Sequence, residues 1–84
     1  MFDEASLRLY IQQAMPGARV DVRDMTGTQD HFEIEVVSAE FEGLPLLERH
    51  RALHRILEVP MASAIHAVKF KALTPAQKDS QKAR

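Results

Sequence analysis

Histidine side chains offer the most specific chemistry in this 84-residue chain, which contains no cysteine. His31 and His66 each open a segment with strand-like alternation of residue types. Neutral imidazole ligates iron, copper or zinc, so the pair is a candidate metal site that supplies half of a four-coordinate shell. The competing interpretation is two ordinary residues at strand ends, and residue type alone favours it because most histidines are not ligands. Thiolate ligands would have to come from another molecule.

The segments around these histidines predict how they are positioned. Residues 31–37 and residues 65–73 alternate apolar and charged side chains, which is typical of strands with one buried face. Residues 45–57 between them predict an amphipathic helix. Because a strand, a crossover helix and a further strand in one sheet usually give a parallel pair, both strands begin at the same end. We therefore expect His31 and His66 at one sheet edge, although the alternation assigns them to opposite faces.

The N-terminal part predicts a helix and a second strand. Residues 3–15 carry an apolar stripe behind a candidate N-cap aspartate, and Pro16-Gly17 ends that helix. Residues 18–23 alternate again, and the polar loop 24–30 joins them to the strand that begins at His31. The simplest connection is an antiparallel hairpin.

The central helix and the C-terminal part complete an α+β order. The apolar stripe of the helix is predicted to hold Leu46, His50, Leu53 and Leu57. Its polar face is predicted to hold Glu48, Arg49, Arg51 and Arg55. We expect Pro60 to interrupt the helix and residues 61–64 to form a short turn. Thr74-Pro75 is a candidate cap for a short helix, and the tail of residues 76–84 is expected to fray because it has no apolar face. The order αββααβ predicts a three-stranded mixed sheet covered by helices, in one domain of residues 1–75.

The charge distribution is uneven along the chain. Residues 1–48 hold three basic against ten acidic side chains, and residues 49–84 hold eight basic against two acidic ones. A basic patch would be built from Arg49, Arg51, Arg55, Lys69 and Lys71. Such a patch attracts an acidic partner, an anionic ligand or nucleic acid. A solvated helix face beside a salt-bridged strand is the alternative that the sequence favours.

Several function classes lack their motifs. The chain has neither a phosphate-binding glycine loop nor a dinucleotide fingerprint, and its three isolated glycines form no G-x-x-G clamp for nucleic acid. His50 and His54 have a metal-compatible spacing but no glutamate between them, which favours structural roles. No serine has a recognisable base, so we expect no enzyme. Without an export signal or an apolar run long enough for a membrane, the cytoplasm is the expected compartment.

The chain resembles the BolA family over nearly its whole length. The resemblance is carried by the order and spacing of short segments, each weak alone. These are Pro16-Gly17-Ala18, the DHFEIEVVS run of residues 30–38, FEGL at 41–44, ERHRAL at 48–53 and IHAVKFKALTP at 65–75. The loop that ends in His31 and the IHAVKFKALTP ending resemble the short bacterial branch linked to acid tolerance and stress response.

The resemblance implies a fold similar to class II KH domains and a non-enzymatic adaptor function in iron–sulfur cluster assembly and trafficking. It implies a monothiol glutaredoxin partner with which the protein shares a bridged [2Fe–2S] cluster. The glutaredoxin would supply a cysteine and a bound glutathione thiolate, and the positions that match the family's ligands here are His31 and His66. The rival implied by the family is a transcriptional regulator that binds DNA through the five basic residues named above. A homodimer and an adaptor that binds no metal also remain open.

Overall fold

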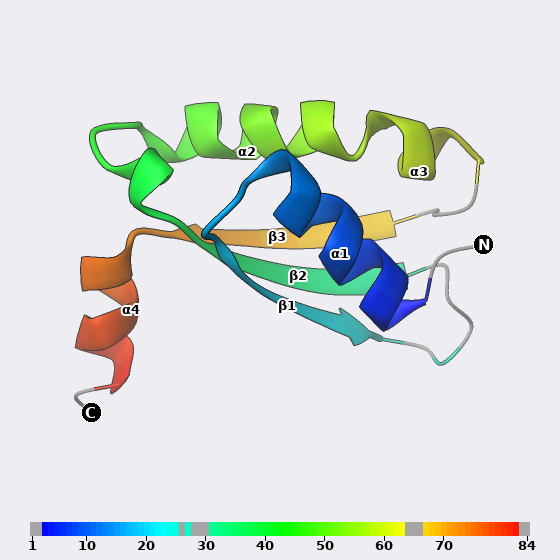
Figure 1. Cartoon of the computed structure of the whole chain (residues 1–84), viewed down its shortest axis with the longest axis horizontal. Helices are drawn as coiled ribbons and strands as arrows, with labels where there is room; N and C mark the ends of the chain where they lie inside the picture. Colours follow the sequence, from blue (N-terminus) through cyan, green and yellow to red (C-terminus); the bar gives the residue numbers. More distant parts are fainter. Residues whose placement is uncertain (1–2, 26, 28–30, 64–66, 83–84) are drawn as a thin grey trace.

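The computed structural model describes residues 3–25, 27, 31–63 and 67–82. Their elements follow the order α-β-β-α-α-β, with a short 3-10 helix before the central helix and an additional helix at the end (Figure 1). The elements are α1 (Glu4–Ala14), β1 (Arg19–Asp24), β2 (His31–Val37), η1 (Ala39–Phe41), α2 (Leu46–Ile56), α3 (Glu58–Ser63), β3 (Ala67–Leu73) and α4 (Pro75–Lys82). None of the helices in these ranges is long and apolar enough to cross a bilayer.

The three strands form one mixed sheet in the order β1-β2-β3. β1 and β2 pair antiparallel, from Arg19 opposite Val37 to Asp24 opposite Phe32. β2 and β3 pair parallel. Both predictions from the sequence, the hairpin and the parallel pair that the α2 crossover creates, are therefore confirmed.

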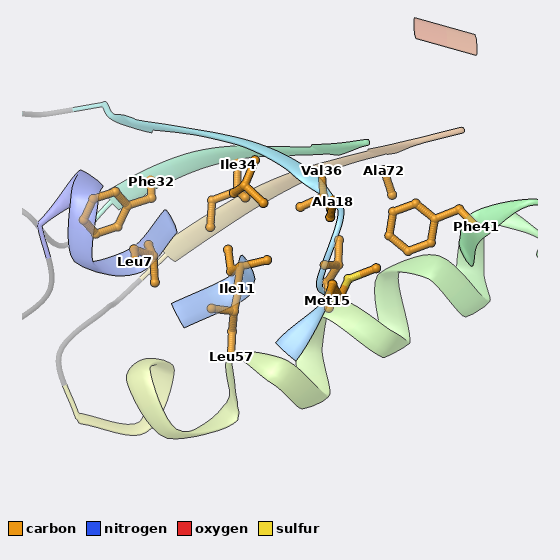
Figure 2. Packing of buried hydrophobic residues seen from close by; sticks show 12 residues of the cluster. Leu7, Ile11, Met15, Ala18, Phe32, Ile34, Val36, Phe41, Leu57 and Ala72 are labelled. Atoms are coloured by element: carbon orange, nitrogen blue, oxygen red, sulfur yellow. The ribbon is translucent and has the colours of Figure 1, made fainter. Parts of the chain in front are cut away.

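One face of the sheet carries the hydrophobic core. Alternation places Phe32, Ile34 and Val36 of β2 on this face, where they are fully or almost fully buried (Figure 2). α1 covers them with Leu7 and Ile11. The core is completed by Met15, Ala18, Val20, Phe41, Leu53, Leu57 and Ala72. The opposite face of the strands is charged, and α4 contacts it through an ion pair between Lys78 and Glu35.

The N-terminal part of helix α2 buries a different side chain from the one that the sequence predicts. Leu46, expected inside, is 59% exposed, whereas Arg49, expected on the polar face, is buried. Leu53 and Leu57 are buried as expected. The Arg49 side chain points into the protein. Burial of its charge is tolerated because the guanidinium donates hydrogen bonds to two backbone carbonyl oxygens and to the Gln77 side-chain amide oxygen.

Two expectations about the C-terminal half need correction. The helix is interrupted as expected, but at Leu57 rather than at Pro60, because α2 ends at Ile56 and α3 begins at Glu58. Pro60 lies within the first turn of α3, where a missing backbone N–H costs no intrahelical bond. The tail expected to fray over residues 76–84 instead forms helix α4 as far as Lys82. Thr74 and Gln77 make a capping box, in which the Gln77 N–H donates to Thr74 Oγ1 and the Thr74 N–H donates to Gln77 Oε1.

Candidate metal centre at the start of β2 and β3

His31 is the first residue of β2, and its side chain is exposed. Its partner across the parallel pair is Ala67, the first residue of β3. The prediction that the two strands begin at the same end of the sheet is thereby confirmed. His66 precedes Ala67 in the sequence but lies outside the described residues. The predicted meeting of the His31 and His66 imidazoles therefore stays a prediction.

The hairpin holds the backbone of His31 from the other side. The Met25 N–H donates to the His31 carbonyl oxygen over 2.8 Å, which closes the base of the loop between β1 and β2. The loop is fixed further by Asp24, whose N–H donates to Glu4 Oε2 at 2.7 Å and whose Oδ1 accepts from the Gly27 N–H at 2.9 Å. His31 is thus an exposed imidazole on a backbone that β3 and the hairpin both position.

The described part of the chain does not complete a metal shell by itself. No cluster of three or more histidine and carboxylate side chains that could hold a metal occurs among residues 3–25, 27, 31–63 and 67–82. The sequence has no cysteine to add. A metal shell built on His31 would therefore need ligands from outside these ranges or from another molecule.

The other two described histidines have structural neighbours. The His54 ring lies edge-on to Phe70, with ring centroids 5.1 Å apart and an interplanar angle of 79°. The His50 ring lies 6.1 Å from the same ring at 60°. Edge-to-face packing of this kind stabilises the contact between α2 and β3. Structural roles for His50 at the core edge and His54 on the helix flank agree with the interpretation from the sequence.

The basic residues predicted as a nucleic-acid surface do not share one surface. Arg49 is buried and donates from Nε to the Leu44 carbonyl at 2.9 Å. Its Nη1 donates to the Ala72 carbonyl at 3.2 Å and to Gln77 Oε1 at 2.8 Å. The guanidinium also lies 6.0 Å from the centroid of the Phe41 ring. Arg49 is therefore a structural cation that no phosphate could reach without unfolding the site.

The remaining four cations lie on separate faces. Arg51 pairs with Glu48 at 3.0 Å on the exposed side of α2. Arg55 lines a hollow beside the end of α1, together with Met15 and Phe41. Lys69 and Lys71 project from the opposite face of β3, the charged face that α4 contacts. Among the described residues this arrangement favours separate cations over a continuous phosphate-binding surface.

Sequence reasoning missed the role of Arg49, which joins α2, β3 and α4. The expected helix cap at Thr74 is confirmed, and the capping-box pattern Thr74-x-x-Gln77 could have indicated that the helix continues into the tail. The partners of Arg49 could not be identified in this way, because Ala72 and Gln77 are 23 and 28 positions away in the chain.

Comparison with known proteins gives a consistent result. The family model described as "BolA-like protein" matches residues 7–77. BolA-like protein 1 of Pongo abelii is 37% identical over 81 residues, which cover 88% of this chain and 59% of that protein. The chain thus spans about three fifths of the length of this curated relative. BolA-like protein 2 of Homo sapiens is 41% identical over 73 residues, 84% of each chain.

Solved structures agree with the sequence matches. A BolA protein homologue from Coxiella burnetii superposes with a TM-score of 0.81 at 30% identity and covers 94% of this chain and 99% of its own. The BolA domain of SufE1 from Arabidopsis thaliana superposes with a TM-score of 0.78 at 27% identity and covers 87% and 92%. The predicted α+β fold, with its three-stranded mixed sheet, is the fold of these proteins.

Proposed function

The chain belongs to the BolA-like family, and on that premise we propose that it is a non-enzymatic adaptor in iron–sulfur cluster handling. In this proposal it binds a monothiol glutaredoxin and shares a bridged [2Fe–2S] cluster with it. His31 and His66 are the ligands from this chain, and the partner contributes a cysteine and a glutathione thiolate. The cluster is the cargo that the two proteins pass on.

The observation that carries the proposal is the register of the parallel pair. It sets the exposed His31 opposite Ala67, the residue that follows His66 in the sequence. A rigid strand end that presents an imidazole to solvent suits a ligand that must meet iron held by another protein. Because the described residues form no complete metal shell, a shared centre also suits the ligand count.

The proposed ligand set has a chemical consequence. Two imidazoles and two thiolates resemble the ligation of a Rieske centre, and histidine ligands raise the reduction potential relative to four thiolates. Protonated imidazole cannot ligate iron, so protons compete with the cluster for the ligand nitrogens, and the shared cluster should become less stable as the pH is lowered.

The test mixes the protein with a monothiol glutaredoxin that carries its [2Fe–2S] cluster and glutathione. The visible absorbance and circular dichroism of the cluster are recorded while size-exclusion chromatography reports the complex. We expect a complex with a spectrum distinct from that of the glutaredoxin alone. His31→Ala combined with His66→Ala should abolish that spectrum, and His54→Ala, which removes an imidazole outside the proposed ligand set, should retain it.

Two outcomes would contradict the proposal. A complex whose spectrum survives the double substitution unchanged would remove His31 and His66 as ligands. A complex that forms without any cluster spectrum would leave an adaptor that binds no metal.

A further inference from the structure

The outer edge of β3 has no strand beside it in the described part of the chain, because the sheet order is β1-β2-β3. Two hydrogen bonds define which backbone groups point to this edge. The Leu73 carbonyl accepts from the Ser38 N–H at 3.0 Å and so points towards β2. The Ala72 carbonyl accepts from Arg49 Nη1 and so points away from β2, towards α2.

Backbone groups of successive residues point to alternate sides of a strand. Lys69 and Lys71 therefore direct their amide and carbonyl groups to β2, and Val68 and Phe70 direct theirs to the outer edge. No backbone partner outside the β2–β3 ladder is found for Val68 or Phe70 among the described residues. The Ala72 carbonyl oxygen already accepts a hydrogen bond from the Arg49 guanidinium, so the part of the edge that is open to a further strand ends before residue 72.

The side chains along this edge differ between the two faces of the sheet. On the face without α1 and α2, Lys69 and Lys71 are exposed and line a hollow of about 310 Å³ together with Glu33. On the other face, Val68 and Phe70 are half-buried apolar side chains that pack against the core. A strand added here would place alternate side chains beside these two environments.

We propose that the outer edge of β3 binds an extended segment of a partner protein, in which acidic and apolar residues alternate, by strand addition. The acidic residues lie beside Lys69 and Lys71, and the apolar residues lie beside Val68 and Phe70. Backbone bonds to Val68 and Phe70 supply the pairing, and the side chains select the segment. The proposal is independent of any cluster bound near His31.

The charge on β3 favours an acidic segment over a second copy of the chain as the partner. Pairing of β3 with β3 of another copy would bring the lysines of both strands together on one face, and like charges across a strand pair are destabilising. Exposed lysine on an edge strand is a known protection against such self-pairing. An acidic segment reverses the sign of this interaction and makes the same edge attractive.

The first experiment measures fluorescence anisotropy with a labelled peptide of sequence EVEFEVE. We expect saturable binding that weakens about tenfold or more when Lys69→Glu and Lys71→Glu are combined, since two favourable charge contacts become repulsive. Arg8→Glu, an exposed charge reversal on α1, is the matched control and should leave the Kd unchanged. A double variant that binds as well as the unsubstituted protein would overturn the proposal.

The second experiment separates strand addition from simple charge attraction. Two peptides of the same sequence carry N-methyl groups on alternate amides, one on the odd residues and one on the even residues. In a bound strand only every second amide points at β3. Methylation of those amides should abolish binding, and methylation of the other set should leave it intact. Equal binding of the two methylated peptides would refute strand addition.

Hydrogen exchange on the unsubstituted protein gives an independent readout. The amide hydrogens of Val68 and Phe70 should exchange quickly in the free protein and slowly in the complex, whereas those of Lys69 and Lys71 should be protected in both. Unchanged exchange at Val68 and Phe70 would overturn the proposal. So would tighter, steeply salt-dependent binding of a single-stranded oligothymidine that displaces the peptide, which would assign the edge to nucleic acid.

Discussion

Replacing Arg49 by methionine should destabilise the protein far more than the same change at a neighbouring arginine. Methionine keeps much of the aliphatic stem but removes the hydrogen bonds to the carbonyls of Leu44 and Ala72 and to Gln77 Oε1. Each such bond contributes about 1 kcal/mol net, and the buried Ala72 carbonyl would be left without this donor, at a cost of about 1–3 kcal/mol. The bonds to the other two oxygens are only partly buried, so we expect a total loss of about 2–4 kcal/mol.

Arg51→Met is the matched control. The Arg51 side chain is 60% exposed and pairs with a partly exposed Glu48, so its loss should cost less than about 0.5 kcal/mol. Urea unfolding followed by far-ultraviolet circular dichroism gives both free energies. A loss of 2 kcal/mol corresponds to a Tm lower by roughly 8–16 °C in a domain of this size.

A double-mutant cycle with Gln77→Ala tests the reasoning further. Because Arg49 and Gln77 bond each other directly, the combined change should cost less than the sum of the two single changes by about 0.5 kcal/mol or more. The reasoning fails if Arg49→Met and Arg51→Met differ by less than about 0.5 kcal/mol, or if the cycle shows strict additivity.

Three further changes test the core, the α4 contact and the α1 cap. Phe32→Ala should lower the unfolding free energy by about 3–5 kcal/mol in urea titrations, because the ring is fully buried. Lys78→Ala should cost about 0.5–1 kcal/mol by the same assay, and the effect should shrink in high salt, because it breaks a partly exposed ion pair with Glu35. Hydrogen bonds from Ser6 lower the pKa of Asp3 below 3.8, so its stabilisation of α1 is present above that value and lost as the pH falls through the folded-state pKa. Asp3→Asn, a neutral cap, should therefore lose less stability than the unsubstituted protein when thermal melts are compared from pH 5 to below the folded-state pKa of Asp3.

The strands and their directions could be predicted because their signals are local. Alternation in residues 31–37 and 67–73 identifies the buried face, and an amphipathic helix between two strands implies a parallel pair. This was enough to set His31 at the same end of the sheet as the start of β3. The proposed pairing of its imidazole with His66 depends on residues outside the described ranges and remains a prediction.

The orientation of α2 could not be predicted from periodicity. Leu46 and Arg49 belong to adjacent stripes of one helix, and hydrophobicity alone assigns the leucine to the core. The structure buries the arginine because oxygen atoms from the Leu44, Ala72 and Gln77 positions converge on it. These oxygen atoms come together only in the folded chain. A hydrophobicity pattern therefore assigns a buried hydrogen-bond donor such as Arg49 to the surface.

The mixed sheet also has a consequence for how the protein folds. In the hairpin, the pair nearest the turn is Asp24 and Phe32, which are eight residues apart. The first pair between β2 and β3 is His31 and Ala67, which are 36 residues apart. The longer closure costs about 1.3 kcal/mol more in chain entropy. We expect the antiparallel pair to form early and the docking of β3 to set the folding rate, so that substitutions in β3 alter the rate of refolding more than those at the hairpin turn.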